Sequence, residues 1–138
     1  MVTMRPATDA DIDAVLGLWA IATTVASTTD DVDGVRALLA HDPGALIAAF
    51  ADDGRIVGTV IAGWDGWRAT MYRLAVLPEF RRAGIATQLV DAAERQLRAR
   101  GARRSHLIVE SEQPAARAFW RSAGYRETDQ LRLVKTFD

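Results

Sequence analysis

The positions of apolar side chains along the chain predict four helices. Apolar residues recur at helical spacing over residues 9–22, over a stretch opened by the acidic run 30–33 and ended by Asp42-Pro43-Gly44, and over residues 84–100. Residues 114–123 form a shorter stretch of the same kind. The helix over 84–100 has the clearest pattern, because one face carries an apolar residue every fourth position and Gly101 follows as a stop.

Shorter apolar runs between these helices predict β-strands. The runs cover residues 45–51, 55–62, 70–77 and 105–110. Asp52-Asp53-Gly54 is a strong hairpin signal between the first two. We also expect a short extended segment at residues 4–7, a polar break over residues 23–29 and a last hairpin from Tyr125 onward.

This order of elements predicts an α+β fold with three layers (αβα). Two helices come first, then a meander of strands, then alternating strands and helices. The expected sheet is mixed and mostly antiparallel, with about six to seven strands, helices on both faces, and a parallel crossover at its centre.

Length and composition indicate an ordinary globular domain. The chain has 138 residues, so we expect a single domain over residues 1–138. Its net charge of −1 argues against a dedicated nucleic-acid binder. No apolar run is long enough to span a membrane, and the first residues lack the apolar core of an export signal, so a cytoplasmic location is expected. The chain has no Cys and two His, which excludes thiolate catalysis and gives no support for a metal site.

One segment carries a chemical signal. Residues 74–87 lead from an apolar strand through a basic turn into the start of the longest predicted helix. A helix start presents unpaired backbone N–H groups and about half a unit of positive charge, so it suits an anion. Gly84 leaves room for a bulky diphosphate, Ala86 keeps the next turn small, and Arg81 and Arg82 add charge. The same residues also fit an ordinary strand–helix turn with solvated arginines. The spacing matches neither a Walker loop nor a dinucleotide fingerprint.

The pattern Arg81-x-x-Gly84-x-Ala86 resembles the Q/R-x-x-G-x-G/A motif of the GCN5-related N-acetyltransferase (GNAT) superfamily. Three further segments, in the order typical of that family, strengthen the resemblance. They are Arg5-Pro6-Ala7-Thr8 before the first helix, the hairpin at 54–58, and Ala116-x-x-Phe119-Trp120-x-x-x-Gly124-Tyr125 near the end.

The resemblance implies a GNAT-like fold in which the strand at 70–77 splays from that at 105–110, with acetyl-CoA lying in the opening. It also implies a set of residues for this acyl donor. The backbone of Leu74, Ala75 and Val76 would pair with the pantetheine, and the amides from Arg81 to Thr87 would hold the pyrophosphate. The implied donor-binding residues are thus Leu74, Ala75, Val76, Arg81, Arg82, Ala83, Gly84, Ile85, Ala86, Thr87 and Gln113, the last of which stands where relatives often have Asn. The partner would be an amine that attacks the thioester directly, without an acyl-enzyme.

The sequence departs from the family where a catalytic acid and base are often found. Trp120 replaces a Tyr often assigned as the acid, and an indole N–H gives up no proton near neutral pH. Ile108 stands where some relatives have Glu. The remaining catalytic candidates are Tyr72 and Glu110. By period two Tyr72 shares a strand face with Leu74 and Val76 and would reach the thioester or belong to the core. Glu110 would orient an amine or a water, or serve as a surface carboxylate.

Two further features leave alternatives open. Trp64, Asp65 and Trp67 lie in a turn where indoles and a carboxylate suit a cationic amine, and a hydrophobic edge or a homodimer contact explains them equally well. The arginines over residues 98–104 flank a helix C-terminus and are expected to be solvated.

The resemblance favours an acetyl-CoA-dependent N-acetyltransferase with a small or peptidic amine acceptor. An acyl-CoA-binding sensor, or a degenerate family member without turnover, is the alternative from another class. A nucleic-acid-binding protein using its arginines is a third, weaker hypothesis.

Overall fold

The computed structural model describes residues 1–22 and 27–137. These residues belong to two compact units, Met1–Leu107 and Ile108–Asp138, which are described separately. Part of the expected polar break, residues 23–26, lies outside the described residues.

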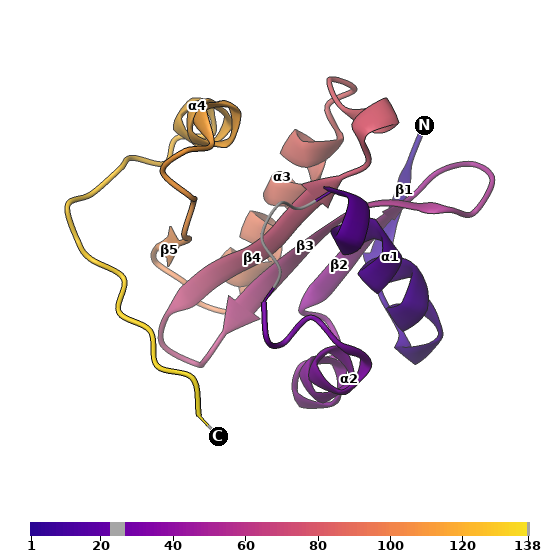
Figure 1. Cartoon of the computed structure of the whole chain (residues 1–138), viewed down its shortest axis with the longest axis horizontal. Coiled ribbons are helices and arrows are strands. Elements are labelled where there is room, and N and C mark those ends of the chain that lie inside the picture. The colour runs from indigo at the N-terminus through magenta and orange to yellow at the C-terminus, as the bar shows by residue number, and fades with distance from the viewer. Residues whose placement is uncertain (23–26, 138) are drawn as a thin grey trace. The chain divides into compact units, whose positions relative to one another are not determined.

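The first unit is built on a sheet whose strands lie side by side in chain order, β1-β2-β3-β4-β5. The strands are β1 (Thr3–Pro6), β2 (Leu46–Phe50), β3 (Ile56–Trp64), β4 (Ala69–Val76) and β5 (Ser105–His106). The first four pair antiparallel, and β4 pairs parallel with β5. The predicted mixed, mostly antiparallel sheet is therefore confirmed (Figure 1).

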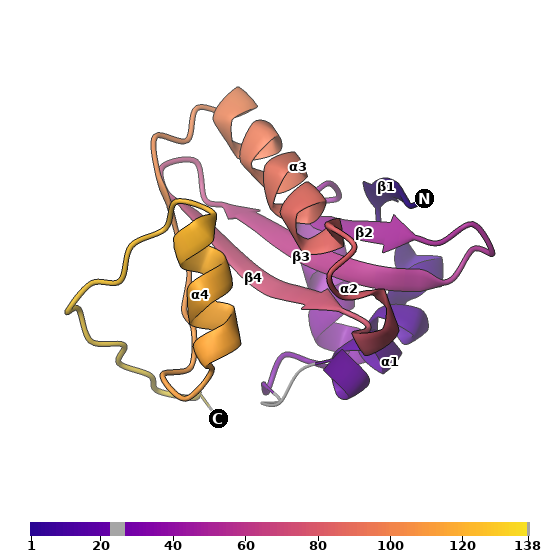
Figure 2. The same cartoon turned by 90° about the horizontal axis from the view of Figure 1, so that it is seen from above.

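Helices cover both faces of this sheet, as the sequence predicts. A short 3-10 turn, η1 (Asp9–Asp11), leads into α1 (Ile12–Ala22), and α2 (Val32–His41) follows. A second such turn, η2 (Pro78–Phe80), comes before α3 (Ile85–Ala99). Figure 2 shows α3 on one side of the sheet and α1 with α2 on the other.

The α1 and α2 side of the sheet carries a core of small and branched side chains. Val15 and Trp19 of α1 and Val35 of α2 are almost fully buried in it. They cluster with Leu46 and Ala48 of β2 and with residues of β3 and β4. Exposing the apolar stripes of these two helices to water is unfavourable, so their burial against the strands stabilises this layer.

On the opposite face, Gly58 lets α3 lie close to β3. A Cβ at this position would be 3.0 Å from Leu89 Cδ1, 3.3 Å from Ile85 Cγ2 and 3.2 Å from the carbonyl oxygen of Ala75. The first turns of α3 therefore pack directly on the backbone of the central strand, which places the start of α3 at the end of β4.

The second unit contains α4 (Pro114–Ser122), which begins with proline at its first position. Trp120 packs edge-to-face against Phe119 and Tyr125, with ring centroids 5.2 and 5.1 Å apart. Glu127 accepts hydrogen bonds from Arg117 and Arg121 at 2.8 and 3.1 Å. These contacts fold residues 125–127 back against α4.

Two expectations about strands are wrong. The described part of the chain forms five strands and not six to seven, because residues 107–110 and those after Tyr125 have no ladder partner in it. The parallel pair lies at one edge of the sheet and not at its centre. An alternating apolar pattern predicts an extended backbone, but a strand also needs a partner at the right distance, which the pattern does not specify.

Filling the space at Gly58 should destabilise the protein. Gly58→Ala pushes a methyl group against Leu89 and a backbone carbonyl, and we expect it to lower the free energy of unfolding by about 1–3 kcal/mol in a urea titration. Gly17→Ala is the matched control, because Gly17 is exposed within α1 with nothing within 4 Å of an added Cβ. That control should gain about 0.5–1 kcal/mol. Equal behaviour of the two variants would contradict this packing.

Candidate functional site

The turn from β4 into α3 is held in a conformation that exposes its backbone amides. Arg82 and Gly84 both have positive φ, 66° and 80°, and Gly84 is the residue that caps α3. Within residues 1–22 and 27–137, no group accepts a hydrogen bond from the N–H of any residue from Arg82 to Thr87. The first amide of α3 that is paired belongs to Gln88, which donates to the carbonyl of Gly84 at 3.0 Å.

The unpaired amides have the geometry and the partial charge that suit an anion. The N–H groups at a helix start add to a partial positive charge of about half a unit. The site is open at Gly84, where an added Cβ would have its nearest neighbour, Gln88 Nε2, 4.0 Å away. The arrangement suits an anion with several oxygens, such as a phosphate or diphosphate.

The two arginines of the turn have different surroundings. Arg81 folds back, and its guanidinium donates to the carbonyl of Val76 at 3.2 Å and to that of Ala22 at 3.5 Å. It thus ties the turn to the ends of β4 and α1. The side chain of Arg82 is exposed and has no hydrogen-bond or ion-pair partner within the described parts of the chain.

Beside this turn, one edge of β4 has no ladder partner in the first unit over residues 71–76. The pairing with β5 covers only Ala69 with Ser105 and Thr70 with His106. The N–H of Leu77 donates to the carbonyl of Val57 at 2.9 Å, so by antiparallel alternation the backbone groups of Val76 face away from β3. An extended ligand can therefore pair with this edge in the manner of an added strand.

A β-bulge at Arg73 interrupts β4 next to that edge. Thr59 pairs with Ala75 and Ile61 with Tyr72, so Val60 alone stands opposite two residues of β4. Arg73 adopts a left-handed conformation with φ of 53°. A bulge of this kind bends its strand and is common beside functional sites.

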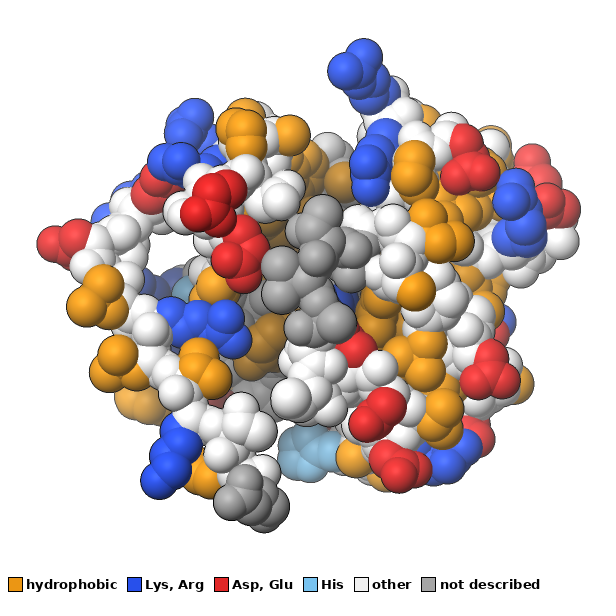
Figure 3. Space-filling view, viewed as in Figure 1, with side chains coloured by type: hydrophobic (Ala, Val, Ile, Leu, Met, Phe, Trp, Pro, Cys, Tyr) orange, Lys and Arg blue, Asp and Glu red, His pale blue; other side chains and the backbone are white. Residues whose placement is uncertain are grey.

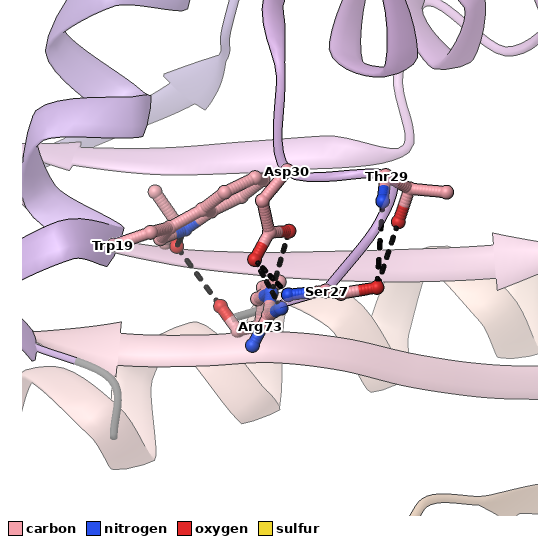
Figure 4. A network of polar contacts seen from close by, with 6 residues as sticks. Trp19, Ser27, Thr29, Asp30 and Arg73 are labelled. Atoms are coloured by element: carbon pink, nitrogen blue, oxygen red, sulfur yellow. Dashed lines mark hydrogen bonds and ion pairs between the residues drawn. The ribbon is translucent and has the colours of Figure 1, made fainter. Parts of the chain in front are cut away.

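A network of polar contacts holds the bulge in place (Figure 4). The buried hydroxyl of Thr59 donates to the carbonyl of Arg73 and accepts from Trp19 Nε1, both at 2.9 Å. The Arg73 guanidinium forms an ion pair with the Asp30 carboxylate through two nitrogens, and both side chains are largely buried. The network joins α1, β3, β4 and the segment before α2.

The bulge changes the face on which Tyr72 lies. Tyr72 stands opposite Ile61, whereas Val76 stands opposite Gly58, so Tyr72 and Val76 are on different faces of the sheet. The expectation that they share a face is wrong, because the extra residue shifts the alternation by one. The Tyr72 side chain is 53% exposed. Gly63 makes room for its ring, since a Cβ there would be 3.2 Å from Tyr72 Cε2.

The other predicted site residues belong to the second unit. The side chain of Glu110 is exposed, and its backbone carbonyl accepts from the N–H of Gln113 at 3.1 Å. Gln113 is the residue that begins α4, and its side chain makes no capping bond there. Trp120 is half-buried in its aromatic contacts.

The turn between β3 and β4 does not suit a cationic amine. Trp64 and Trp67 line a hollow together with four arginines, Arg68, Arg100, Arg103 and Arg104. The carboxylate of Asp65 accepts from the backbone N–H groups of Arg68 and Trp67 at 2.7 and 2.8 Å, and these bonds hold its pKa below the usual range. The indoles are therefore paired with positive charge and not with an available acid.

The described residues offer neither a metal site nor a membrane span. No three side chains of His, Cys, Asp or Glu come together there in a way that could hold a metal ion. No helix among them is long and apolar enough to cross a membrane.

Comparisons with known proteins agree with this geometry. The family model described as "Acetyltransferase (GNAT) family" matches residues 13–125. The chain is similar to the acetyltransferase ECA0875 of Pectobacterium atrosepticum, with 34% identity over 125 residues, 91% of this chain and 88% of that protein.

Solved structures share the fold. Ard1 from Thermoplasma volcanium superposes with a TM-score of 0.83 at 23% identity, over 92% of this chain and 84% of the other. AAC(6')-Iy, in complex with the bisubstrate analogue CoA-S-monomethyl-acetylneamine, superposes with a TM-score of 0.77 at 21% identity. The match covers 100% of this chain and 99% of the other. The resemblance seen in the sequence is thus confirmed, and the chain belongs to the acetyltransferase (GNAT) family.

Proposed function

We propose that this protein is an N-acetyltransferase that moves an acetyl group from acetyl-CoA directly to an amine of a small molecule or a peptide. The observation that carries the proposal is the row of unpaired amides from Arg82 to Thr87 beside the part of the β4 edge that β5 leaves unpaired. One feature suits a diphosphate and the other an extended amide chain, and the donor contains both. Family membership supports acyl transfer as the chemistry.

We assign the donor to the backbone of Leu74, Ala75 and Val76 and to the turn and first residues of α3. The turn residues are Arg81, Arg82, Ala83, Gly84, Ile85, Ala86 and Thr87. Arg81 acts in this assignment by fixing the turn to Val76 and Ala22, while Arg82 adds charge at the open side. Gln113 completes the set, at the start of α4.

The proposed reaction forms an N–C bond and breaks a C–S bond. The amine nitrogen attacks the thioester carbonyl, the thiolate leaves, and the nitrogen loses a proton. The chain has no Cys, so an acyl-thioenzyme has no place in it. Holding the two reactants together, with backbone donors near the carbonyl, can lower the barrier by several kcal/mol.

We keep Tyr72 and Glu110 as candidates for proton transfer. The phenol of Tyr72 is half-exposed beside the bulge and can give up its proton, which the indole of Trp120 cannot. The thiolate of CoA can also leave without being protonated, because its conjugate acid titrates only about one to two units above neutral pH. Glu110 is exposed and can orient an amine or a water.

We further propose that residues 1–138 act as a single acetyltransferase domain in the cytoplasm. The family match crosses from the first unit into the second, which supports one domain. The complex of AAC(6')-Iy with an analogue that joins CoA to an aminosugar supports an amine as the acceptor. The alternative is a sensor that binds acyl-CoA without turnover, and it is favoured by Trp120 and Ile108, which stand where relatives have Tyr and Glu.

Binding of CoA should depend on Gly84. Gly84→Glu places a negative side chain among the unpaired amides, and we expect it to abolish the rise in melting temperature that CoA causes in the wild type. A ligand at 100 times its dissociation constant adds roughly 2.7 kcal/mol of stability. Gly101→Glu is the matched control, since Gly101 also has positive φ, has nothing within 4 Å of an added Cβ, and lies at the other end of α3. A CoA shift that survives in the Gly84 variant would place the donor elsewhere.

Turnover of acetyl-CoA with a panel of amines tests the activity itself and the role of Tyr72. We expect release of CoA with at least one amine, and a fall in kcat of about a hundredfold in Tyr72→Phe with an unchanged KM for acetyl-CoA. Trp120→Phe keeps the ring packing and should retain at least about a tenth of the wild-type rate, because it removes only an N–H. Near wild-type rates in both variants would mean that positioning suffices. Tight CoA binding with no turnover of any amine would favour the sensor.

We propose a homodimer as the assembly, and the C-terminal segment supports it. Large apolar side chains stand out along this segment in Figure 3. They are Leu131, Leu133, Val134 and Phe137, which are 87, 90, 68 and 85% exposed. A run of this kind is costly to leave in water, and a second copy would cover it.

Light scattering during size-exclusion chromatography should therefore give a molar mass of twice the chain mass of 15.1 kDa. Leu131→Ser with Leu133→Ser should shift the protein to the monomer, because it removes the two most exposed of the four apolar side chains to be covered. Arg126→Ser with Arg132→Ser changes the same segment without removing that surface and should leave the dimer intact. A wild-type protein that is monomeric at all concentrations would rule the homodimer out.

A further inference from the structure

A hollow of about 430 Å³ lies at the end of the first unit opposite to the unpaired amides. It is lined by Trp64, Gly66, Trp67, Arg68, Arg100, Gly101, Arg103 and Arg104, and we call it the arginine hollow. These residues come from the β3–β4 turn and from the end of α3 and the loop after it. Figure 2 shows both elements at the same end of the sheet. Since α3 has 15 residues, this end is about 22 Å from its start.

Every charged side chain that lines the arginine hollow is positive, and most of this charge is unpaired. Arg100 forms an ion pair with Asp42 at 2.8 Å. Across the described stretches 1–22 and 27–137, no carboxylate lies within 4.0 Å of the guanidinium of Arg68, Arg103 or Arg104. The end of a helix attracts cations, but its partial charge is only about half a unit. Three unpaired guanidiniums exceed what the end of α3 can balance.

Two indoles give the arginine hollow an apolar wall. Trp64 is half-buried at the end of β3, whereas Trp67 is 74% exposed. The guanidinium of Arg68 stacks on the Trp67 ring, 4.4 Å from its centroid, and holds that ring in place. An exposed ring that is fixed in this way offers a flat surface on which another ring can stack.

The turn that carries Trp67 is itself well fixed. Asp65 accepts the backbone N–H groups of Trp67 and Arg68, and Gly66 has the positive φ of 95° that the turn requires. The carboxylate of Asp65 is thus used within the turn, and it does not line the hollow. The positions of the exposed indole and of Arg68 are therefore set before any ligand arrives.

We propose that the arginine hollow binds a small organic anion that carries phosphate groups and a flat ring, of the class of the nucleoside phosphates. Guanidinium groups bind phosphate oxygens through paired N–H donors, and an indole stacks on a base. The volume lies within the range of small-ligand sites, which is roughly 300–1,000 Å³. This site is separate from the one proposed for acetyl-CoA and does not depend on it.

Uridine 5′-diphosphate is a suitable probe, because it combines two phosphates with a pyrimidine ring. Titrated by calorimetry and by tryptophan fluorescence at low salt, it should bind the wild-type protein at one site. Its affinity should fall as salt is raised. Inorganic pyrophosphate alone and uridine alone should each bind more weakly, since each engages only one wall of the hollow.

Variants locate the binding. Arg103→Gln with Arg104→Gln should lower the affinity for uridine diphosphate by at least about tenfold. Arg95→Gln with Arg98→Gln is the control, because it removes the same charge from exposed positions on α3 outside the hollow. The control should change the affinity by less than about twofold. Trp67→Leu should lower the affinity for uridine diphosphate more than the affinity for pyrophosphate. Gly84→Glu should leave the affinity for uridine diphosphate unchanged.

Four results would overturn the proposal. One is the absence of binding at millimolar probe, which would make the arginines a solvated cluster. Equal losses in the two arginine pairs would show a diffuse charge effect. Loss of binding in Gly84→Glu would place the probe at the start of α3. Tight binding of a single-stranded oligonucleotide without binding of the nucleotide would indicate a nucleic-acid surface instead.

Discussion

The hydroxyl group of Thr59 is the contact on which the geometry of the site depends. It is fully buried in the central strand, and it uses both its donor and its acceptor, toward Arg73 and Trp19. A buried hydroxyl without these partners would cost roughly 1–3 kcal/mol, so the bond to the carbonyl of Arg73 strongly favours the bulged form of β4. The bulge then sets which face Tyr72 occupies relative to Val76. One side chain thus fixes the strand against which the donor is proposed to lie.

The ion pair between Arg73 and Asp30 acts on the same bulge from the other side. A left-handed conformation is unfavourable for a residue with a Cβ, by about 1–2 kcal/mol. The paired carboxylate helps to offset this cost and also ties the segment before α2 to β4. Breaking a buried pair by removing one partner costs more than the pair contributes, because the remaining charge stays buried. The bulge is therefore held by two independent contacts, one to the backbone and one to the side chain of Arg73.

Local patterns allowed much of the fold to be predicted, and long-range pairing limited the rest. The helix over 84–100 follows from its own apolar stripe and its closing Gly101, and α3 matches it within a residue at each end. The turn before it could also be identified as an anion site, because Gly84 and the helix start are neighbours in the sequence. The bulge could not, since an arginine with positive φ has no local signature and its stabilising partners, Thr59 and Asp30, are 14 and 43 residues away. The strand at 105–110 was overestimated for the same reason, because an apolar run does not show how long its neighbour stays within reach.

Electrostatics explains why the two ends of α3 differ. At its start the backbone supplies the positive charge, so that end needs no basic side chain in direct contact and stays open to an anion. At its end the backbone is negative, and arginines gather there, which is favourable for the helix whatever else they do. The overall charge of −1 conceals this arrangement, because acidic residues in other parts of the chain balance the arginines. Some of these acidic residues lie in the first turns of η1, α1 and α2, where each is close to the positive end of its own helix. Net charge is a sum over the whole chain, whereas a ligand responds to the few groups within a Debye length, about 8–10 Å at ordinary salt. A nearly neutral protein can therefore carry two separate anion sites, one made from amides and one from guanidinium groups.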